Sequence, residues 1–186
     1  VNVLVSKGQT DAAYTPDPAL EYGKVYYWRV DEVNGAPDNT VFKGSVWSFR
    51  VEPYAYLVTP TVVTASSFEA DKGPDHTIDG SGLDADGQHS VVLTDMWMSD
   101  GKSGLPAWIR YEFDREYKLY ELWVWNSNSG LETYMGLGAK DVTIEYSTDG
   151  QTWAPLENVP EFARAPGQPG YGPGIVVDFG GVAAKY

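Results

Sequence analysis

The chain has 186 residues, 42% hydrophobic and 14% aromatic, enough for the core of one large domain or two small ones. Its 26 acidic against 13 basic residues give a formal net charge of -13, which excludes nucleic acid and anionic membrane surfaces as favoured partners. The absence of cysteine excludes disulfides and thiolate sites, and no apolar run reaches the roughly 20 residues needed for membrane insertion.

Short segments rich in β-branched and aromatic residues recur along the chain and predict β-strands. Gly, Pro, Asn or Asp bounds each segment, and twenty glycines and twelve prolines favour turns over helices. This pattern predicts an all-β fold of sandwich or barrel type. The predicted strands are residues 24–33, 45–51, 107–113, 119–125 and 141–147.

A change in composition near Pro53 predicts a domain boundary. The strand before it ends at Val51, and the aromatic-rich stretch that follows leads into a new block of turns and strands. We therefore predict a first domain over residues 1–52, a short and stiff linker over 53–59, and a larger second domain over 60–186.

The first domain carries the pattern of a tyrosine corner. Tyr26 follows the turn glycine Gly23 at the start of a strand, so we expect its phenol to bond back to the backbone of the crossover. The stretch up to Val51 resembles the second half of a fibronectin type III domain. The resemblance implies a partial β-sandwich that acts as a spacer or display unit, with its other strands upstream of Val1. We expect four aromatic residues to form its core: Tyr26, Trp28, Trp47 and Phe49.

An ordered set of motifs covers most of the second domain. The motifs are Thr64–Ser67, His76–Gly80, Met96–Ser99, Pro106–Phe113, Val142–Trp153, Val177–Phe179 and Val182–Tyr186. In this order they resemble the discoidin family, also called coagulation factor type C domains, which includes galactose-binding-like carbohydrate-binding modules. The resemblance implies an eight-stranded jelly-roll β-sandwich with a ligand site on the loops at one end.

Strands are expected to be missing at both ends, either because the sequence is cut there or because another chain supplies them. The last strand of the discoidin family continues past the position of Tyr186, so we expect this strand to be missing, and the start at Val1 suggests an excised or mature piece. The combination of the two domains resembles large exported proteins of planctomycete-type bacteria. This resemblance implies a secreted protein that works outside the cell or at the cell surface.

The acidic, glycine-rich loop over residues 79–88 is the best candidate metal site. Closely spaced carboxylates and freed carbonyls suit calcium, which takes six to eight oxygen ligands. The discoidin resemblance implies a structural calcium here, held by the Asp of the Asp-Gly turn, while an ordinary turn is the alternative. The candidate metal ligands are Asp79, Asp84, Asp86, His76 and Ser81.

Loops after Trp125 and over residues 165–174 contain the groups that sugar recognition needs, an aromatic face with amides around it. Trp123 and Trp125 share one face of their strand, Leu122 and Val124 share the other, and the pattern leaves open which face is inward. The candidate ligand-binding residues are Trp125, Asn126, Asn128, Tyr134, Gln168 and Tyr171.

The sequence predicts a binding protein rather than an enzyme. It contains no G-x-S-x-G or H-E-x-x-H motif and no evident acid–base pair. We expect a non-catalytic extracellular module that binds a glycan or polysaccharide. The alternative is a structural or adhesive module that binds protein partners, either other domains of the parent protein or cell-envelope proteins. A shallow groove with one exposed aromatic favours the glycan, and a broad apolar patch favours the protein.

Overall fold

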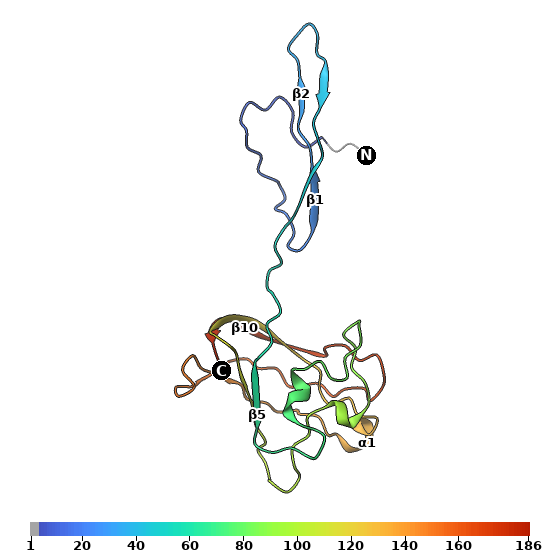
Figure 1. Cartoon of the computed structure of the whole chain (residues 1–186), viewed down its shortest axis with the longest axis vertical. Coiled ribbons are helices and arrows are strands. Elements are labelled where there is room, and N and C mark those ends of the chain that lie inside the picture. The colour runs from blue at the N-terminus through green and yellow to red at the C-terminus, as the bar shows by residue number, and fades with distance from the viewer. Residues whose placement is uncertain (1–3) are drawn as a thin grey trace. The chain divides into compact units, whose positions relative to one another are not determined.

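The computed structural model describes residues 4–186 and divides the chain into two compact units, with the division between Leu57 and Val58 (Figure 1). This point lies inside the stretch 53–59 that the sequence assigns to a linker. The described residues form strands and loops with very little helix, in keeping with an all-β fold. None of the helices described in residues 4–186 has the length and apolar character to cross a bilayer.

The first unit is a twisted antiparallel ribbon. Strand β1 (Val25–Trp28) pairs with β4 (Trp47–Arg50), and β2 (Asp31–Val33) pairs with β3 (Val41–Lys43). The tyrosine corner forms as predicted, because the phenol oxygen of Tyr26 accepts a 2.9 Å hydrogen bond from the backbone N–H of Glu21. This bond ties the chain that precedes β1 to the ribbon.

Four aromatic residues of the first unit share one face of this ribbon. Tyr26 stacks on Phe49 and Trp28 on Trp47, with ring centroids 6.2 Å and 6.3 Å apart. However, no residue between 4 and 57 is buried, and Trp28 and Trp47 are 50% and 61% exposed. The prediction that these side chains form a buried core is wrong for this structure, since a two-stranded ribbon has no second layer to cover its face.

The second unit contains three antiparallel pairs. Strand β5 (Val62–Ala65) pairs with β6 (Ile109–Glu112), β7 (Tyr117–Val124) with β10 (Ile175–Ala184), and β8 (Glu145–Tyr146) with β9 (Ala154–Pro155). Each sheet described in residues 4–186 has two strands, fewer than a jelly-roll sheet contains. Short helices lie in the connections: η1 (Pro74–Thr77), η2 (Leu93–Asp95) and α1 (Glu132–Met135).

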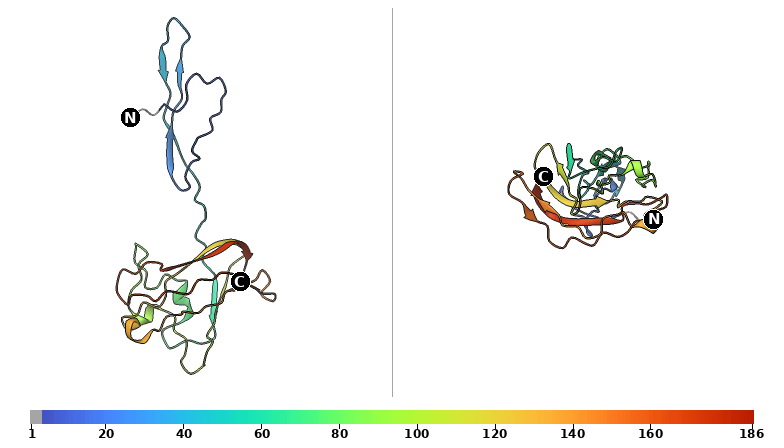
Figure 2. Two further views of the ribbon diagram at one scale, coloured as in Figure 1. Left: turned by 180° about the vertical axis from the view of Figure 1, so that it is seen from behind. Right: turned by 90° about the horizontal axis from the view of Figure 1, so that it is seen from below.

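The β7–β10 pair forms a long curved ribbon whose inner face covers the core (Figure 2). Leu122 and Val124 pack inward, while Trp123 between them is 54% exposed, which answers the question that the sequence left open. Trp125 follows the end of β7, and its indole N–H donates to the carbonyl of Gly87 at 2.9 Å. The buried centre of the core consists of Phe162, Ile175, Val177 and Phe179.

The last two residues are held by the rest of the second unit. The backbone N–H of Tyr186 donates to the carbonyl of Ser147 at 2.9 Å, and the Ser147 N–H donates back to the carbonyl of Tyr186 at 3.0 Å. The Arg110 guanidinium lies 5.2 Å from the Trp153 ring centroid and 4.6 Å from the Tyr186 centroid, so both rings make cation–π contacts with it. Trp108, by contrast, is 54% exposed.

Candidate functional site

Three loops of the second unit meet, and we call the region they form the loop end: residues 82–90, 126–139 and 163–171. His89 connects the first loop to the third, since its backbone N–H donates to the carbonyl of Tyr171 at 2.7 Å. Its own hairpin closes through a β-bridge to Leu83. The third loop also lies against α1, because a Cβ at Gly167 would stand 3.7 Å from Thr133. Segments distant in sequence therefore build one surface.

Asn128 lies in the loop of residues 126–139 and hydrogen-bonds it to the other two loops. Its side chain is fully buried, and its amide nitrogen donates to the carbonyls of Gln168 at 2.8 Å, Ser90 at 3.1 Å and His89 at 3.3 Å. Its Oδ1 accepts the N–H of Gly167 at 2.9 Å. All of its polar atoms are used inside the protein, which corrects the expectation that Asn128 contacts a ligand.

Asn126 also joins segments of the loop end through its side-chain hydrogen bonds. Its amide nitrogen donates to the carbonyls of Ala139 at 2.8 Å and Ala163 at 2.9 Å, and its Oδ1 accepts the N–H groups of Ala139 and Ser127. The residue is buried, so the expectation of a ligand contact is corrected here as well. Buried amides that are fully hydrogen-bonded rigidify the loops they join.

Glu132 is a buried carboxylate that the sequence analysis did not single out. Its Oε2 accepts the N–H of Leu137 at 2.9 Å and of Gly138 at 3.2 Å, and Arg164 approaches its Oε1 at 3.4 Å. These charge-assisted bonds close the chain after α1. No local motif announces this role, because Arg164 comes from a loop 32 residues away.

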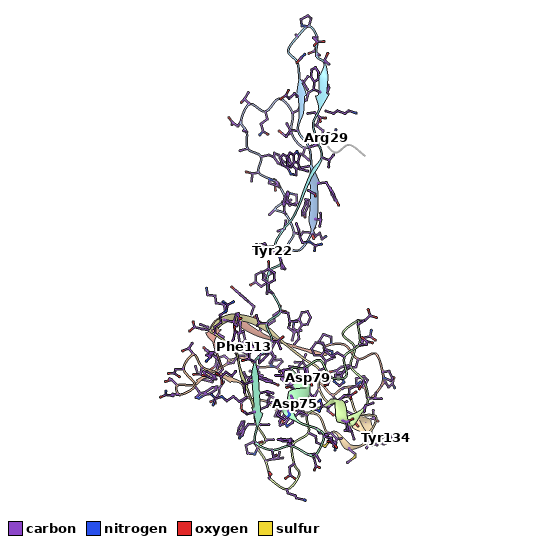
Figure 3. The ribbon with its side chains drawn as sticks, viewed as in Figure 1. Tyr22, Arg29, Asp75, Asp79, Phe113 and Tyr134 are labelled. Atoms are coloured by element: carbon purple, nitrogen blue, oxygen red, sulfur yellow. The ribbon has the colours of Figure 1, made fainter. Side chains whose placement is uncertain are left out.

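Tyr134 is a highly exposed predicted site residue, at 85% (Figure 3). It lies on α1, and the exposed aliphatic side chains of Leu131 and Met135 lie in the same short segment. The exposed residues Arg164 and Gln168 come from the adjoining loop. The loop end therefore presents an exposed aromatic ring with exposed aliphatic neighbours on α1, and an exposed amide and guanidinium on the adjoining loop.

Tyr171 points into the protein. Its phenol oxygen is buried and has no hydrogen-bond partner among the residues described, although the backbone N–H groups of Asn126 and Gly174 approach it without bonding geometry. Burial raises the pKa of this phenol above its ordinary value. Its expected role as a ligand contact is therefore not supported. The indole N–H of Trp125 is likewise used within the protein, on Gly87.

The predicted metal loop brings together a different set of groups from the one expected. The ligand atoms of Asp75, His76 and Asp79 lie within 4.8 Å of one another, and Figure 3 shows both aspartates at η1. Ser81 contacts this group through a 3.0 Å bond between its hydroxyl and Nδ1 of His76. Burial opposes ionisation of Asp79, but hydrogen bonds from Ser81 and the nearby His76 outweigh it and lower the pKa.

Asp84 and Asp86 belong to a separate turn, which the Asp84 carboxylate stabilises. Oδ1 of Asp84 accepts the N–H groups of Asp86 and Gln88, both at 2.9 Å, while Asp86 is exposed. Two carboxylates remain near η1, and the third group is an imidazole, whereas calcium prefers six to eight oxygens. The geometry of this donor set would allow a cation to bind, but the donors are not specific for calcium.

Comparisons of the chain with known protein families, with curated proteins and with solved structures give no match. The function is therefore argued from the geometry of the loop end.

Proposed function

We propose that the second unit is a non-catalytic carbohydrate-binding module, of the jelly-roll type that the discoidin resemblance implies, and that the loop end is its binding surface. The observation that carries the proposal is the exposed ring of Tyr134 on loops that buried amides hold in place. An exposed aromatic ring suits the apolar face of a pyranose. A prearranged framework reduces the entropy lost on binding.

Polar groups for the sugar hydroxyls come from the loop beside α1. Gln168 is exposed, and its backbone carbonyl is fixed by the amide of Asn128 at 2.8 Å. Arg164 has a half-exposed side chain that is anchored at one nitrogen by Glu132. An amide and a guanidinium make paired hydrogen bonds to neighbouring hydroxyls. We therefore assign Tyr134, Gln168 and Arg164 to the sugar surface.

A binding role suits the chemistry better than catalysis. A catalytic carboxylate has to reach the substrate, whereas the buried carboxylate of the loop end, Glu132, is committed to the backbone N–H groups of Leu137 and Gly138. We place the protein outside the cell or at the cell surface, with the first unit as a fibronectin type III-like spacer. The tyrosine corner at Tyr26 supports this assignment of the first unit.

The second candidate function is adhesion to a protein partner, such as another domain of the parent protein or a cell-envelope protein. Leu131, Met135 and Leu137 are exposed in the same segment as Tyr134, and aliphatic side chains around a ring are typical of a protein contact. The two functions differ in the ligand that Tyr134 recognises.

A glycan-array screen of the full chain with the variant Tyr134→Ala tests the proposal. We expect saturable binding to one class of glycan and a loss of at least about fivefold in affinity, since an aromatic platform contributes about 1 kcal/mol or more. The matched control is Tyr27→Ala, which removes an exposed tyrosine from the first unit and should bind as the wild type does. A folded wild type that binds no glycan would favour the protein partner.

A further inference from the structure

A second concave site lies away from the loop end, at an irregularity in β10. The register between β10 and β7 shifts between Asp178 and Val182, where Gly180 and Gly181 adopt φ values of 60° and 82°. Oδ1 of Asp178 accepts the N–H of Gly180 at 2.7 Å and fixes the turn. Bulges of this kind re-aim side chains and often border functional sites.

Next to this bulge is a shallow depression of about 350 Å³ that is largely open to solvent, which we call the bulge cavity. Its other wall is formed by Tyr146 of β8 and by residues 155–158. Phe179, Val182 and Leu156 line it and are part of the hydrophobic core, so its floor is apolar. The volume falls at the lower end of the range for small-molecule sites.

The polar lining of the bulge cavity is acidic. Glu157 and Asp178 contribute carboxylates and Asn158 an amide. Neither carboxylate takes part in the ion pairs found among residues 4–186. Glu121 lies directly across from Asp178 in the β7–β10 pair and adds a third negative charge nearby. Residues 58–186 carry 19 acidic and 8 basic side chains, so the surrounding field also attracts cations.

We infer that the bulge cavity binds a protonated primary amine carried on a short apolar body. The apolar floor takes up the methylene groups, and the ammonium group reaches the unpaired carboxylates of Glu157 and Asp178. The half-buried Tyr146 supplies a ring that also favours a cation. A lysine side chain, a free diamine and an amino sugar share this chemistry. The site is independent of the sugar surface around Tyr134.

Titration of the full chain with pentylamine, followed by amide shifts in heteronuclear NMR, tests this inference. We expect binding with a dissociation constant of about 1 mM and shifts centred on Tyr146, Phe179 and Val182. Pentanol lacks the charge and ammonium chloride lacks the apolar body, so each should bind at least about fivefold more weakly. Cadaverine, an acetylated lysine amide and glucosamine oligomers then distinguish the three sources by relative affinity.

Glu157→Gln and Asp178→Asn should each weaken pentylamine about fivefold, while Glu116→Gln, which removes a charge outside the cavity, should not. Asparagine at 178 keeps an oxygen for the Gly180 N–H, and Glu157→Gln provides a second variant that leaves the bulge untouched. The inference is overturned if pentylamine does not bind, if pentanol or ammonium binds equally well, if Glu157→Gln and Asp178→Asn both bind as the wild type does, or if the shifts map elsewhere.

Discussion

At the scale of single residues, Asp149 stabilises its turn to an extent that depends on the charge of its carboxylate. Its Oδ1 accepts the N–H groups of Gln151 and Thr152, both at 2.8 Å, and the hydroxyl of Ser147 at 3.0 Å. These bonds favour the ionised carboxylate and lower its pKa from 3.8 to about 2.

Because the folded pKa is lowered, the stability from Asp149 is present above about pH 4 and is lost as the pH falls towards about 2. Asp149→Asn should therefore be less stable than the wild type at neutral pH, and the difference should shrink between about pH 4 and 2. Urea denaturation across this range measures it, with the exposed Asp141→Asn as the control. A constant difference at every pH would contradict the assignment.

Asp79 tests whether the group at η1 takes calcium, which stays a prediction. If calcium binds only the folded state, it stabilises the second unit by about 2.7 kcal/mol at a hundredfold excess over its dissociation constant. We expect the melting temperature to rise with calcium relative to chelator, and Asp79→Asn to abolish this rise. Asp86→Asn should keep it, because Asp86 lies outside the group of Asp75, His76 and Asp79. Equal melting temperatures with calcium and with chelator would contradict the calcium site and favour an ordinary Asp-Gly turn.

At the scale of elements, the β7–β10 pair contains an unfavourable contact. Glu121 and Asp178 lie directly opposite each other, and Glu121 also accepts the indole N–H of Trp123 at 2.8 Å. Glu121→Gln keeps an oxygen for Trp123 and removes the like-charge repulsion. We expect the free energy of unfolding to rise by about 0.2–0.5 kcal/mol at low salt, and this gain to fade at high salt.

Chemical denaturation at two salt concentrations measures the effect of Glu121→Gln. Glu116→Gln changes the net charge of the chain equally but lies in the turn before β7, so it serves as the control. A gain that is equal in both variants would show that the total charge matters and that the cross-strand pair does not.

The sequence predicts those strands whose own residues are rich in aromatic and β-branched side chains. Strands β1, β4, β6 and most of β7 coincide with aromatic and β-branched segments. Strand β10 was not predicted as a whole, because Gly180 and Gly181 interrupt its pattern and form a bulge only against β7. Within the predicted strand 141–147 only Glu145–Tyr146 forms a β-strand, where it pairs with β9.

Some roles in the candidate site could likewise be predicted from the local sequence, and others could not. Tyr134 was predicted because a loop aromatic is an ordinary sign of binding; the structure shows that it is exposed, and its role in binding stays a prediction. Asn126 and Asn128 were misinterpreted, because the carbonyl groups that bury their amides come from loops up to 40 residues away. From the sequence alone, an asparagine whose buried side chain joins loops looks the same as an asparagine that contacts a ligand.

At the scale of the whole molecule, the two units should differ in local stability. No residue between 4 and 57 is buried, whereas the second unit has a core under β7 and β10. Two-stranded ribbons are marginal in water, so we expect the amides of β1 and β4 to exchange at least about a hundredfold faster than those of β7 and β10. Hydrogen exchange with mass spectrometry of the full chain measures this ratio.

The tyrosine corner provides the internal comparison for that experiment. Tyr26→Phe removes the acceptor of the Glu21 N–H and should speed exchange in the first unit alone. Slow exchange in β1 and β4 of the wild type would contradict the expectation and would show that another surface covers their aromatic face.

The stacked pair of Trp28 and Trp47 gives the first unit an optical label of its own. Two indoles whose centroids are 6.3 Å apart and whose planes are inclined by 29° couple their electronic transitions. Such coupling is expected to produce a paired positive and negative band in the far-ultraviolet circular dichroism, where the strong indole transitions lie. The band reports on the pairing of β1 with β4, so the integrity of the ribbon is readable in an intact chain without labelling.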